Sequence, residues 1–593
     1  MKLIFSRINR WKVLIFLNAV YLVAGVAWIC LIPYNNAPDE NTHFHYSVEF
    51  IIQHHRLPVW GVDDIERFQH ALSSYNQMPA LNYVLCAVGA AIGKKAFGLE
   101  GYLGARLVSL LWGLVFLNFL FLAVKEICGN EKHALIVSAA IAFIPQVFFS
   151  FCYVNSDAHS LAIAAIAGYA LVRFMRGQLT SECRGRACAC PSVSERVPTS
   201  RATTSSKFPD LNTIFLAAAI GLLFSAKYNY YIYFPCIAVV LLLAAWRRVV
   251  SWQAIGKLIV ASVVFSVIIS GFWFIRNYFL YGNPLPILKG EQFFKAMALA
   301  REAHPVNHGL SIASLKWLFD QGFIKSTFDS FFAVFGYLNV GFHRSVYTIL
   351  EFAVLAACTF FVIDLLRARD RLLDLIFAGL AVMVGLVMAM HVWACLTFDY
   401  QAQGRYNFTI LLPIALFAGW AITRKVSLRR HVVFFLILMS WLFIGANLLI
   451  ARTYASSIRF AVSWPGSAES GHVEKKSVLT ARRTEKNFYS TGKMSFDGAA
   501  PASLRIDFPA AFLARYRDFK VEFETGSGVT NFDWTAIPPQ ASTNLIFNQP
   551  LSALDIYAQD AYLVLPLEGL PAKIKSARIE FRLEHRRLYD TCR

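Results

Sequence analysis

The chain opens with a long apolar run that turns abruptly polar. Residues 13–46 read V-L-I-F-L-N-A-V-Y-L-V-A-G-V-A-W-I-C-L-I-P-Y-N-N-A-P-D-E-N-T-H-F-H-Y. The run Val13–Pro33 is long enough to cross a bilayer, which takes about 20 mostly apolar residues. Basic residues precede this run, and Lys and Arg gather on the cytoplasmic side of membrane proteins. We therefore expect an uncleaved first span whose polar continuation leaves the membrane on the extracytoplasmic side.

Acidic residues stand where this run leaves the membrane. Asp39 and Glu40 are adjacent, and His43 and His45 follow about one helical turn later. One interpretation is that Pro38-Asp39 begins a short helix, since Asp is a favoured N-cap and Glu favours the first turn. The sharper hypothesis is a catalytic base at the membrane surface.

The composition is that of a polytopic membrane protein. Of 593 residues, 57% are hydrophobic and 16% are charged, and the mean hydropathy is +0.48, whereas soluble domains carry about 25% charged residues. Lys and Arg, which give a net charge of +19, occur in short segments between apolar runs. Positive-inside topology explains this pattern, so we expect no nucleic-acid partner. The eleven cysteines are mostly scattered singly through apolar runs and indicate no disulfide framework.

About eleven segments are apolar enough to cross the membrane, and the basic loops between them give their directions. The apolar run Pro79–Leu99 carries Lys94 and Lys95 near its end, and every later basic loop would face outward if this run crossed. We therefore expect it to be a re-entrant or interfacial helix. The expected spans are residues 13–33, 103–124, 134–154, 161–174, 213–225, 230–246, 258–274, 347–366, 375–397, 408–422 and 432–450.

The expected fold is a polytopic α-helical transmembrane domain, residues 1–450, followed by a β-rich tail, residues 451–593. In the first domain we expect a first outer loop with surface-lying helices (34–102), a flexible cytoplasmic linker (176–210) and a large outer loop (276–346). The tail alternates apolar and polar residues, as in F-K-V-E-F-E at 519–524. That period is typical of half-buried strands and predicts an extracytoplasmic β-sandwich-like domain.

With this topology an unusual set of ionisable residues falls on the outer face. A single Lys or Arg there would be explained by snorkelling to the headgroups. Several cations together with carboxylates favour a substrate path. Guanidinium groups suit a phosphate at the interface, and a carboxylate can remove a proton from an acceptor hydroxyl while the phosphate leaves a sugar carbon. The set comprises Asp39, Glu40, His43, Asp157, Lys227, Arg276, Asp399 and Arg405.

Several short motifs, taken in order, resemble one family. They are P-D-E-x-x-H at 38–43, Q-M-P-A-L-N-Y at 77–83, A-R-L-x-S at 105–109, P-Q-x-x-x-S-x-x-x-x-N-x-D-A at 145–158, R-N-x-x-L-Y-G-x-P-L at 276–285 and Q-G-R-Y at 403–406. Together they resemble the membrane-embedded GT-C glycosyltransferases, and within these the bacterial DUF2142-type proteins. The resemblance covers about residues 1–450.

This resemblance implies an inverting glycosyltransferase that uses a polyprenyl-phosphate-linked sugar donor. It implies that Asp39 is the catalytic base, supported by Glu40, and that Asp157 is a second acidic position. It also implies that the donor phosphate is contacted by Arg106, Lys227 and Arg405. His43, Arg276 and Tyr406 complete the predicted substrate-binding set.

Two other functions use the same features. One is a polymerase or ligase that moves a lipid-linked oligosaccharide. The other is a transporter or flippase for a lipid-linked sugar, whose intramembrane ionisable groups would be Glu351, Asp364 and His391.

The sequence also leads to expectations about cofactors, partners and location. We expect no obligatory cofactor; a divalent cation, Mg²⁺ or Mn²⁺, would bind among Asp39, Glu40, Asp157 and His43 if one is used. The expected partners are the donor, a glycan or lipid-linked acceptor, and the bilayer. The expected location is the bacterial inner (cytoplasmic) membrane, with a cytoplasmic N-terminus and a periplasmic tail.

Overall fold

The computed structural model divides into two compact units. One consists of Met1–Ile29 and Asn41–Ala446, and the other of Cys30–Glu40 and Asn447–Arg593. Each unit is described by itself. The described residues are 10–32, 34, 36–60, 63, 74–187, 210–285, 308–336, 338, 340–367, 371–397, 400–424, 426–454, 457–464, 475–485, 488–491, 494–495, 503–507, 515–525, 528–531, 542–543, 545–548, 553–556, 562–566 and 574–584.

The first unit is helical, and six helical segments of its described part are long and apolar enough to cross a membrane. They are Lys12–Leu31, Gly101–Cys128, Ser156–Gln178, Tyr228–Trp246, Trp252–Tyr281 and Val433–Arg452. They lie in α1 (Arg10–Leu31), α5 (Gly101–Cys128), α8 (Ser156–Ala187), η3 with α10 (Tyr228–Ile232, Tyr233–Trp246), α11 with η4 and α12 (Trp252–Ser266, Val267–Gly271, Phe272–Tyr281), and α19 (Val426–Tyr454). The multi-pass character is confirmed, whereas the count of about eleven spans stays a prediction.

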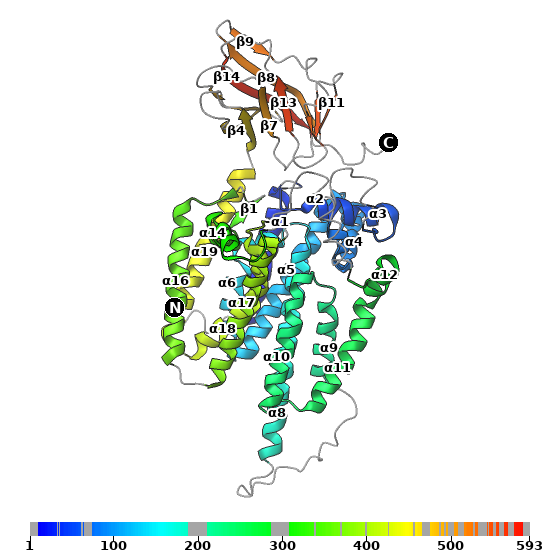
Figure 1. Cartoon of the computed structure of the whole chain (residues 1–593), viewed down its shortest axis with the longest axis vertical. Helices are drawn as coiled ribbons and strands as arrows, with labels where there is room; N and C mark the ends of the chain where they lie inside the picture. The colour runs from blue at the N-terminus through cyan, green and yellow to red at the C-terminus, as the bar shows by residue number, and fades with distance from the viewer. Residues whose placement is uncertain are drawn as a thin grey trace. The chain divides into compact units, whose positions relative to one another are not determined.

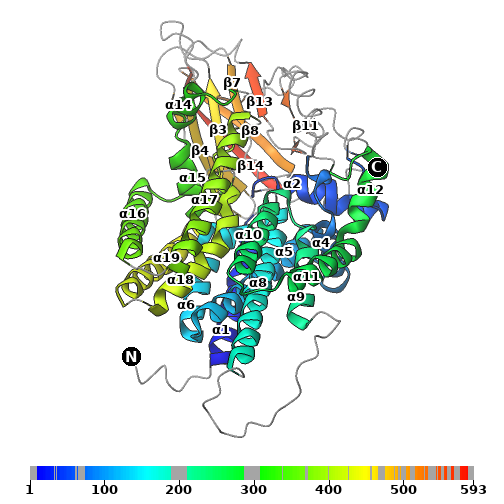
Figure 2. The same cartoon turned by 60° about the horizontal axis from the view of Figure 1, so that its bottom comes forward.

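Helix α5 lies at the centre of the bundle. It packs against α4 (Leu81–Phe97), α6 (Glu131–Ala142), α8 and α18 (Leu411–Arg424), and the row continues from α8 through α9 (Leu211–Leu223) to α11 (Figures 1 and 2). Helices α4 and α5 approach closely because glycines face each other: a Cβ on Gly104 would lie 2.5 Å from the Gly89 carbonyl oxygen. Helix α4 has 17 residues and is not among the candidate spans. Its re-entrant or interfacial placement stays a prediction.

The first outer loop contains short helices, as its amphipathic pattern predicts. They are α2 (Glu40–His43), the π-helical turn η1 (Phe44–Glu49), α3 (Phe50–His54) and η2 (Ser74–Gln77). The second amphipathic stretch expected there, residues 65–72, lies outside the described residues. Elements η1 and α3 contact α4, so this loop packs against the start of the second apolar run.

The expected span 134–154 is not one helix, and that prediction was wrong. Helix α6 ends at Ala142, and α7 (Pro145–Ser150) begins after a break. Pro145 has no N–H to continue the ladder, and Ile144 before it is extended, with ψ 121°. The chain from 151 to 155 is then irregular but buried.

Two expected loop boundaries are also corrected. The predicted linker 176–210 begins as helix, because α8 continues to Ala187; the first proline after Arg176 is Pro191, so no proline interrupts the helical hydrogen bonds before it. The predicted outer loop 276–346 begins later, because α12 continues to Tyr281, where the left-handed Gly282 (φ 66°) ends the helix.

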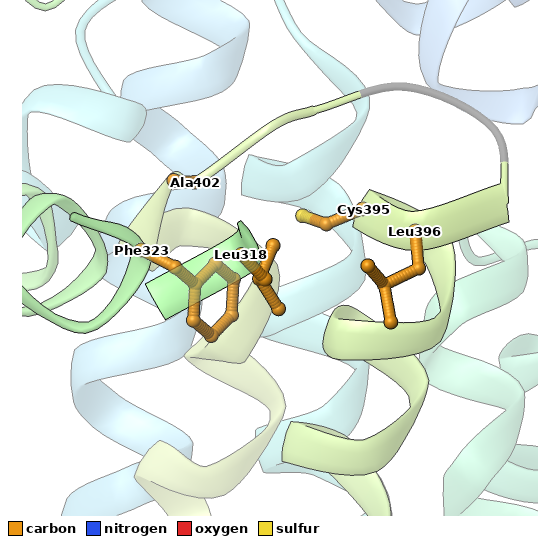
Figure 3. Packing of buried hydrophobic residues seen from close by; sticks show 5 residues of the cluster. All are labelled: Leu318, Phe323, Cys395, Leu396 and Ala402. Carbon is orange, nitrogen blue, oxygen red and sulfur yellow. The ribbon is translucent and has the colours of Figure 1, made fainter. Parts of the chain in front are cut away.

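The described part of that outer loop folds against the bundle. It forms α14 (Ile312–Asp320), α15 (Phe323–Phe332) and a hairpin of β1 (Val334–Phe335) and β2 (Val340–Gly341). Helices α16 (Arg344–Arg367) and α17 (Arg371–Thr397) follow, then η5 (Gly404–Ile410). An apolar cluster joins α14, α15, the end of α17 and the segment before η5 through Leu318, Phe323, Cys395, Leu396 and Ala402 (Figure 3).

The described part of residues 457–584 forms strands that join into one hydrogen-bonded sheet. The sheet order is β10-β13-β7-β3-β4-β5-β14-β8-β12-β11, with β6 on β14 and β9 on β8. Alternate residues are buried, including Val521 and Phe523 on β8 and Ala577 and Ile579 on β14, as expected for strands with one covered face. The sandwich-like packing and the domain boundary at residue 451 stay predictions. The strands are Ser457–Trp464 (β3), Lys475–Glu485 (β4), Phe488–Thr491 (β5), Met494–Ser495 (β6), Ser503–Asp507 (β7), Arg515–Thr525 (β8), Gly528–Asn531 (β9), Ser542–Thr543 (β10), Leu545–Asn548 (β11), Ala553–Ile556 (β12), Tyr562–Pro566 (β13) and Ile574–Glu584 (β14).

Replacing Gly404 tests how η5 is held. A Cβ there would lie 2.2 Å from the Phe331 backbone nitrogen, so Gly404→Ala should force η5 and α15 apart and lower the free energy of unfolding by about 1–3 kcal/mol. The matched control is Gly385→Ala in α17, where a Cβ meets nothing within 4 Å. Thermal unfolding of the detergent-purified protein measures both, and equal melting temperatures would contradict the expectation.

Candidate functional site

A buried ion pair lies at one end of the helical unit. Lys227 Nζ lies 3.1 and 3.2 Å from the two carboxylate oxygens of Asp157. Their side chains are only 10% and 4% exposed. Asp157 is in the first turn of α8, where the helix dipole favours an anion. The Lys227 backbone N–H donates to Ser160 Oγ at 2.8 Å, so main chain and side chain both bind the start of α8.

The 145–158 motif builds the turn that presents Asp157. Pro145 begins α7, and Gln146 Oε1 accepts from the Val334 N–H at 3.1 Å. The Asn155 amide donates to the Ser150 carbonyl at 2.6 Å, and its oxygen accepts from the Ala158 N–H at 2.9 Å. Asn155 therefore caps α8 and closes the preceding turn.

Tyr406 brings a second cation to the pair. Lys227 Nζ lies 5.5 Å from the centre of the Tyr406 ring, and the Arg405 guanidinium lies 5.4 Å from it, both within cation–π range. Arg405 is buried, and its Nη1 donates to Tyr153 Oη at 3.4 Å. The Q-G-R-Y segment thus meets the ends of α7 and α8, and the Gly404 N–H donates to Ser330 Oγ at 2.8 Å to hold it there.

His391 holds this segment from the other side. Asn407 Nδ2 lies 3.1 Å from His391 Nδ1, and His391 Nε2 lies 2.8 Å from the Gln401 carbonyl oxygen. An amide nitrogen only donates, so Nδ1 accepts and Nε2 carries the proton. The two nitrogens therefore fasten both ends of the 401–407 segment. In the sequence His391 stood out only as an intramembrane ionisable group.

The first outer loop reaches the same end through four hydrogen-bonding residues. His43 Nδ1 lies 2.8 Å from Tyr83 Oη. Asn82, beside Tyr83, donates to the Asn155 carbonyl at 2.8 Å, which connects α4 to the cap of α8. Tyr228, beside Lys227, donates to the Gln77 carbonyl at 2.8 Å. The hydrogen bonds of this loop therefore fasten α4 and the residues beside His43 to the segments that carry Asp157 and Lys227.

Asp39 and Glu40 belong to the second unit, in the segment Cys30–Glu40. Asp39 is half-buried and has φ 61°, and the Glu40 N–H donates to the Ala37 carbonyl at 3.3 Å. Glu40 is fully buried. His43 follows Asp39 by four residues along the chain. The roles of Asp39 and Glu40 stay predictions.

Two predicted substrate contacts bind the protein's own backbone. Arg106 is fully buried, and its Nη1 donates to the Ile29 carbonyl at 2.9 Å, where a cation stabilises the C-terminal end of α1. Arg276 Nη2 donates to the carbonyls of Leu57 and Pro58 at 3.3 and 2.8 Å and so fixes the first outer loop to α12. Their contact with a donor phosphate stays a prediction.

Other acidic candidates have different surroundings. Partial burial would raise the pKa of Asp63, but hydrogen bonds from Arg56 and the Val59 N–H outweigh it and lower its pKa, so this carboxylate is a weaker base than an ordinary Asp. Glu351 is paired with Arg344 at 2.6 Å. Asp399 and the Asp364 side chain lie outside the described residues. In the described part of the chain, no three His, Cys, Asp or Glu side chains group as a metal site would require.

Comparison with known proteins gives structural similarity alone. No protein-family model and no curated protein sequence matches the chain. It is similar to the Archaeoglobus fulgidus oligosaccharyltransferase tethered with an acceptor peptide, at 13% identity and TM-score 0.40, covering 74% of this chain and 55% of that one. For the same enzyme complexed with Zn and sulfate, the identity is 15% and the TM-score 0.39, and the match covers 74% of this chain and 53% of that one. For ArnT from Cupriavidus metallidurans in the apo state, the identity is 14% and the TM-score 0.37, and the match covers 74% of this chain and 77% of that one. The match thus spans about half of the oligosaccharyltransferase chain, and we base the proposed function on the chain's own residues.

Separating the two members of the ion pair tests its structural part. Lys227→Met leaves the Asp157 carboxylate buried without its cation and should lower the free energy of unfolding by about 3–5 kcal/mol. Adding Asp157→Asn to Lys227→Met removes both charges and should recover most of that loss. Thermal and denaturant unfolding measure both proteins.

The matched control for this pair is Arg344→Gln, which breaks two more exposed ion pairs, with Asp329 and Glu351, and should cost no more than about 1 kcal/mol for each. A double variant as unstable as Lys227→Met would show that the ion pair does not set the stability of this end.

Proposed function

We propose that the protein is a membrane glycosyltransferase that transfers a sugar from a polyprenyl-phosphate donor to a glycan or lipid-linked acceptor on the extracytoplasmic side. One observation supports it above the others: Lys227 and Arg405, from separate segments, lie on the ring of one tyrosine beside Asp157. Two cations gathered in a partly dry site suit a phosphate, and a fixed guanidinium can hold two of its oxygens.

The transfer step uses a negative charge at the acceptor hydroxyl and positive charges at the leaving phosphate. Asp39 removes the proton from the acceptor hydroxyl, and the resulting oxygen forms a bond to the anomeric carbon. The bond from that carbon to the phosphate oxygen breaks, and its electron pair leaves with the lipid phosphate. Lys227 and Arg405 stabilise the charge that develops there. Attack opposite to the leaving phosphate inverts the anomeric centre.

Asp157 and Tyr406 act as positioning residues in this mechanism. A lysine side chain is long and flexible, and the two-oxygen contact with Asp157 holds its ammonium in one place. Tyr406 places the ammonium and the guanidinium on one aromatic ring. Holding both cations before the substrate arrives reduces the ordering required in the transition state.

Replacing the proposed base tests this mechanism. Asp39→Asn should abolish sugar transfer while leaving expression and melting temperature unchanged. Asn is the right substitute because Asp39 has a left-handed backbone, which Asn tolerates and Ala does not. The assay follows transfer of radiolabelled sugar from a polyprenyl-phosphate donor in membranes.

The control is Asp63→Asn, which removes a carboxylate from the same outer loop and should retain full transfer. Undiminished transfer by Asp39→Asn would rule out this residue as the base. Comparing a lipid-linked monosaccharide with a lipid-linked oligosaccharide as donor separates this function from that of a polymerase or ligase.

Chelation addresses the cofactor. Because Lys227 and Arg405 already supply positive charge for the phosphate, we expect transfer to continue at an unchanged rate after treatment with EDTA. The measurement is the same transfer assay before and after metal removal, with Mg²⁺ and Mn²⁺ added back separately. Loss of transfer that either ion restores would assign an obligatory metal.

A further inference from the structure

Buried polar atoms without a hydrogen-bond partner gather around the Asp157–Lys227 pair. Among the described residues they include Ser156 Oγ, Tyr230 Oη, Asn407 Oδ1, Thr409 Oγ1 and both amide atoms of Asn229. Tyr230 is 0% exposed, Asn407 and Thr409 are each 2% exposed, and Ser156 is 5% exposed. Folded proteins pair roughly nine in ten such groups, and each exception costs about 1–3 kcal/mol. Such a concentration at one end of the unit indicates a place where a ligand completes the bonding.

These atoms come from three elements that meet at the ion pair. Ser156 precedes Asp157 at the start of α8, Asn229 and Tyr230 follow Lys227 in η3, and Asn407 and Thr409 lie in η5, which contacts both η3 and α8. Asp157 is close enough to Tyr230 to act on it electrostatically. Tyr233 Oη donates to the Thr409 carbonyl at 2.6 Å, which fixes the end of η5 against α10. The unpartnered groups are therefore held on ordered elements.

The chemistry of these groups is that of a sugar site. Hydroxyls and amides both donate and accept, which matches sugar hydroxyls, whereas an anion is bound by cations and N–H groups. The five residues carry no formal charge; of the charges beside them, Asp157 is bound to Lys227, and the proposed function assigns Lys227 and Arg405 to the donor phosphate. We propose that the five uncharged residues form the pocket for the donor's sugar ring, and that this pocket selects an uncharged sugar. This inference rests on the proposed function and specifies its substrate class.

Exclusion of charged sugars follows from burial. A uronic acid would bring a carboxylate against neutral, dehydrated groups, and an amino sugar would bring an ammonium. Neither charge would gain a partner among the five residues, so each would lose its hydration without compensation. A site that bonds specific hydroxyls also discriminates against analogues that lack them, because its own groups are then left unpaired.

The test measures binding of short-chain donors to the full-length detergent-purified protein. The probes are farnesyl phosphate alone and its conjugates with glucose, galactose, mannose, glucuronic acid and glucosamine. We expect at least one uncharged conjugate to bind more tightly than farnesyl phosphate, and both charged conjugates to bind more weakly than that one. Tyr230→Phe and Thr409→Val should each weaken the best uncharged conjugate about three- to tenfold, as loss of one hydrogen bond does, and leave farnesyl phosphate unchanged.

Two kinds of control separate loss of a pocket hydroxyl from a general effect on folding. Tyr169→Phe and Thr359→Val remove hydroxyls elsewhere in the helical unit and should change no affinity. Because the Tyr230 hydroxyl has no hydrogen-bond partner among the described residues, Tyr230→Phe should not lower the melting temperature of the ligand-free protein.

Two outcomes overturn different claims. The sugar pocket is wrong and the proposed function stands if farnesyl phosphate binds and the stable double variant at Asp157 and Lys227 binds it more weakly, but a charged conjugate binds as tightly as any uncharged one. The same holds if Tyr230→Phe and Thr409→Val bind the best uncharged conjugate as tightly as the unaltered protein does. If neither farnesyl phosphate nor any conjugate binds the unaltered protein, the proposed function itself is wrong.

Discussion

The buried contact between Asp157 and Lys227 is the constraint around which this end of the helical unit is built. Lys227 Nζ lies 3.1 and 3.2 Å from the two carboxylate oxygens of Asp157. The two buried charges offset the free-energy penalty of dehydration only while they stay together. Any displacement of α8 relative to η3 would separate them. The pair therefore fixes the relative position of two elements that are 70 residues apart in the chain, and the Tyr406 ring extends that register to η5.

The end of the helical unit that carries the ion pair contains backbone that is not helical, and neighbouring residues must satisfy its hydrogen bonds. Irregular backbone near the hydrocarbon is tolerated only where protein or a polar cavity covers it. Here the break after α6, the turn before α8, η3 and η5 all come to the same end. Three side chains bond carbonyls that these breaks leave without helical partners. Asn155 donates to the Ser150 carbonyl, Asn82 to the Asn155 carbonyl and His391 to the Gln401 carbonyl. The irregular segments are thus ordered rather than exposed.

The sequence predicted which residues lie together better than it predicted their contacts. Its motifs singled out Asp157, Arg405 and Tyr406, and the outer-face charges added Lys227; the structure brings these four together, while their roles stay predictions. It did not predict that Lys227 is already bound by Asp157, nor that Arg106 is turned onto the Ile29 carbonyl, because side-chain pairing depends on which segments meet and hydropathy does not determine that. The break at Pro145 was visible as a residue type, but the apolar residues on both sides of it favoured a continuous span. The two partners of His391, the Asn407 side chain and the Gln401 carbonyl, lie 16 and 10 residues away in the chain, so its own surroundings in the sequence did not indicate them.

The unpartnered hydroxyls and amides beside the ion pair complete this physical picture. A phosphate site made of cations alone would bind any phospholipid, since headgroup phosphates are abundant at the surface of a bilayer. Discrimination has to come from groups that need a hydrogen-bond donor as well as an acceptor in the ligand. Buried hydroxyls and amides both donate and accept, and an ionised phosphate can only accept, so a polyhydroxylated ligand satisfies them more fully. Because these hydroxyls and amides lie next to Lys227, recognition of the sugar would be coupled to recognition of the lipid phosphate that departs from it.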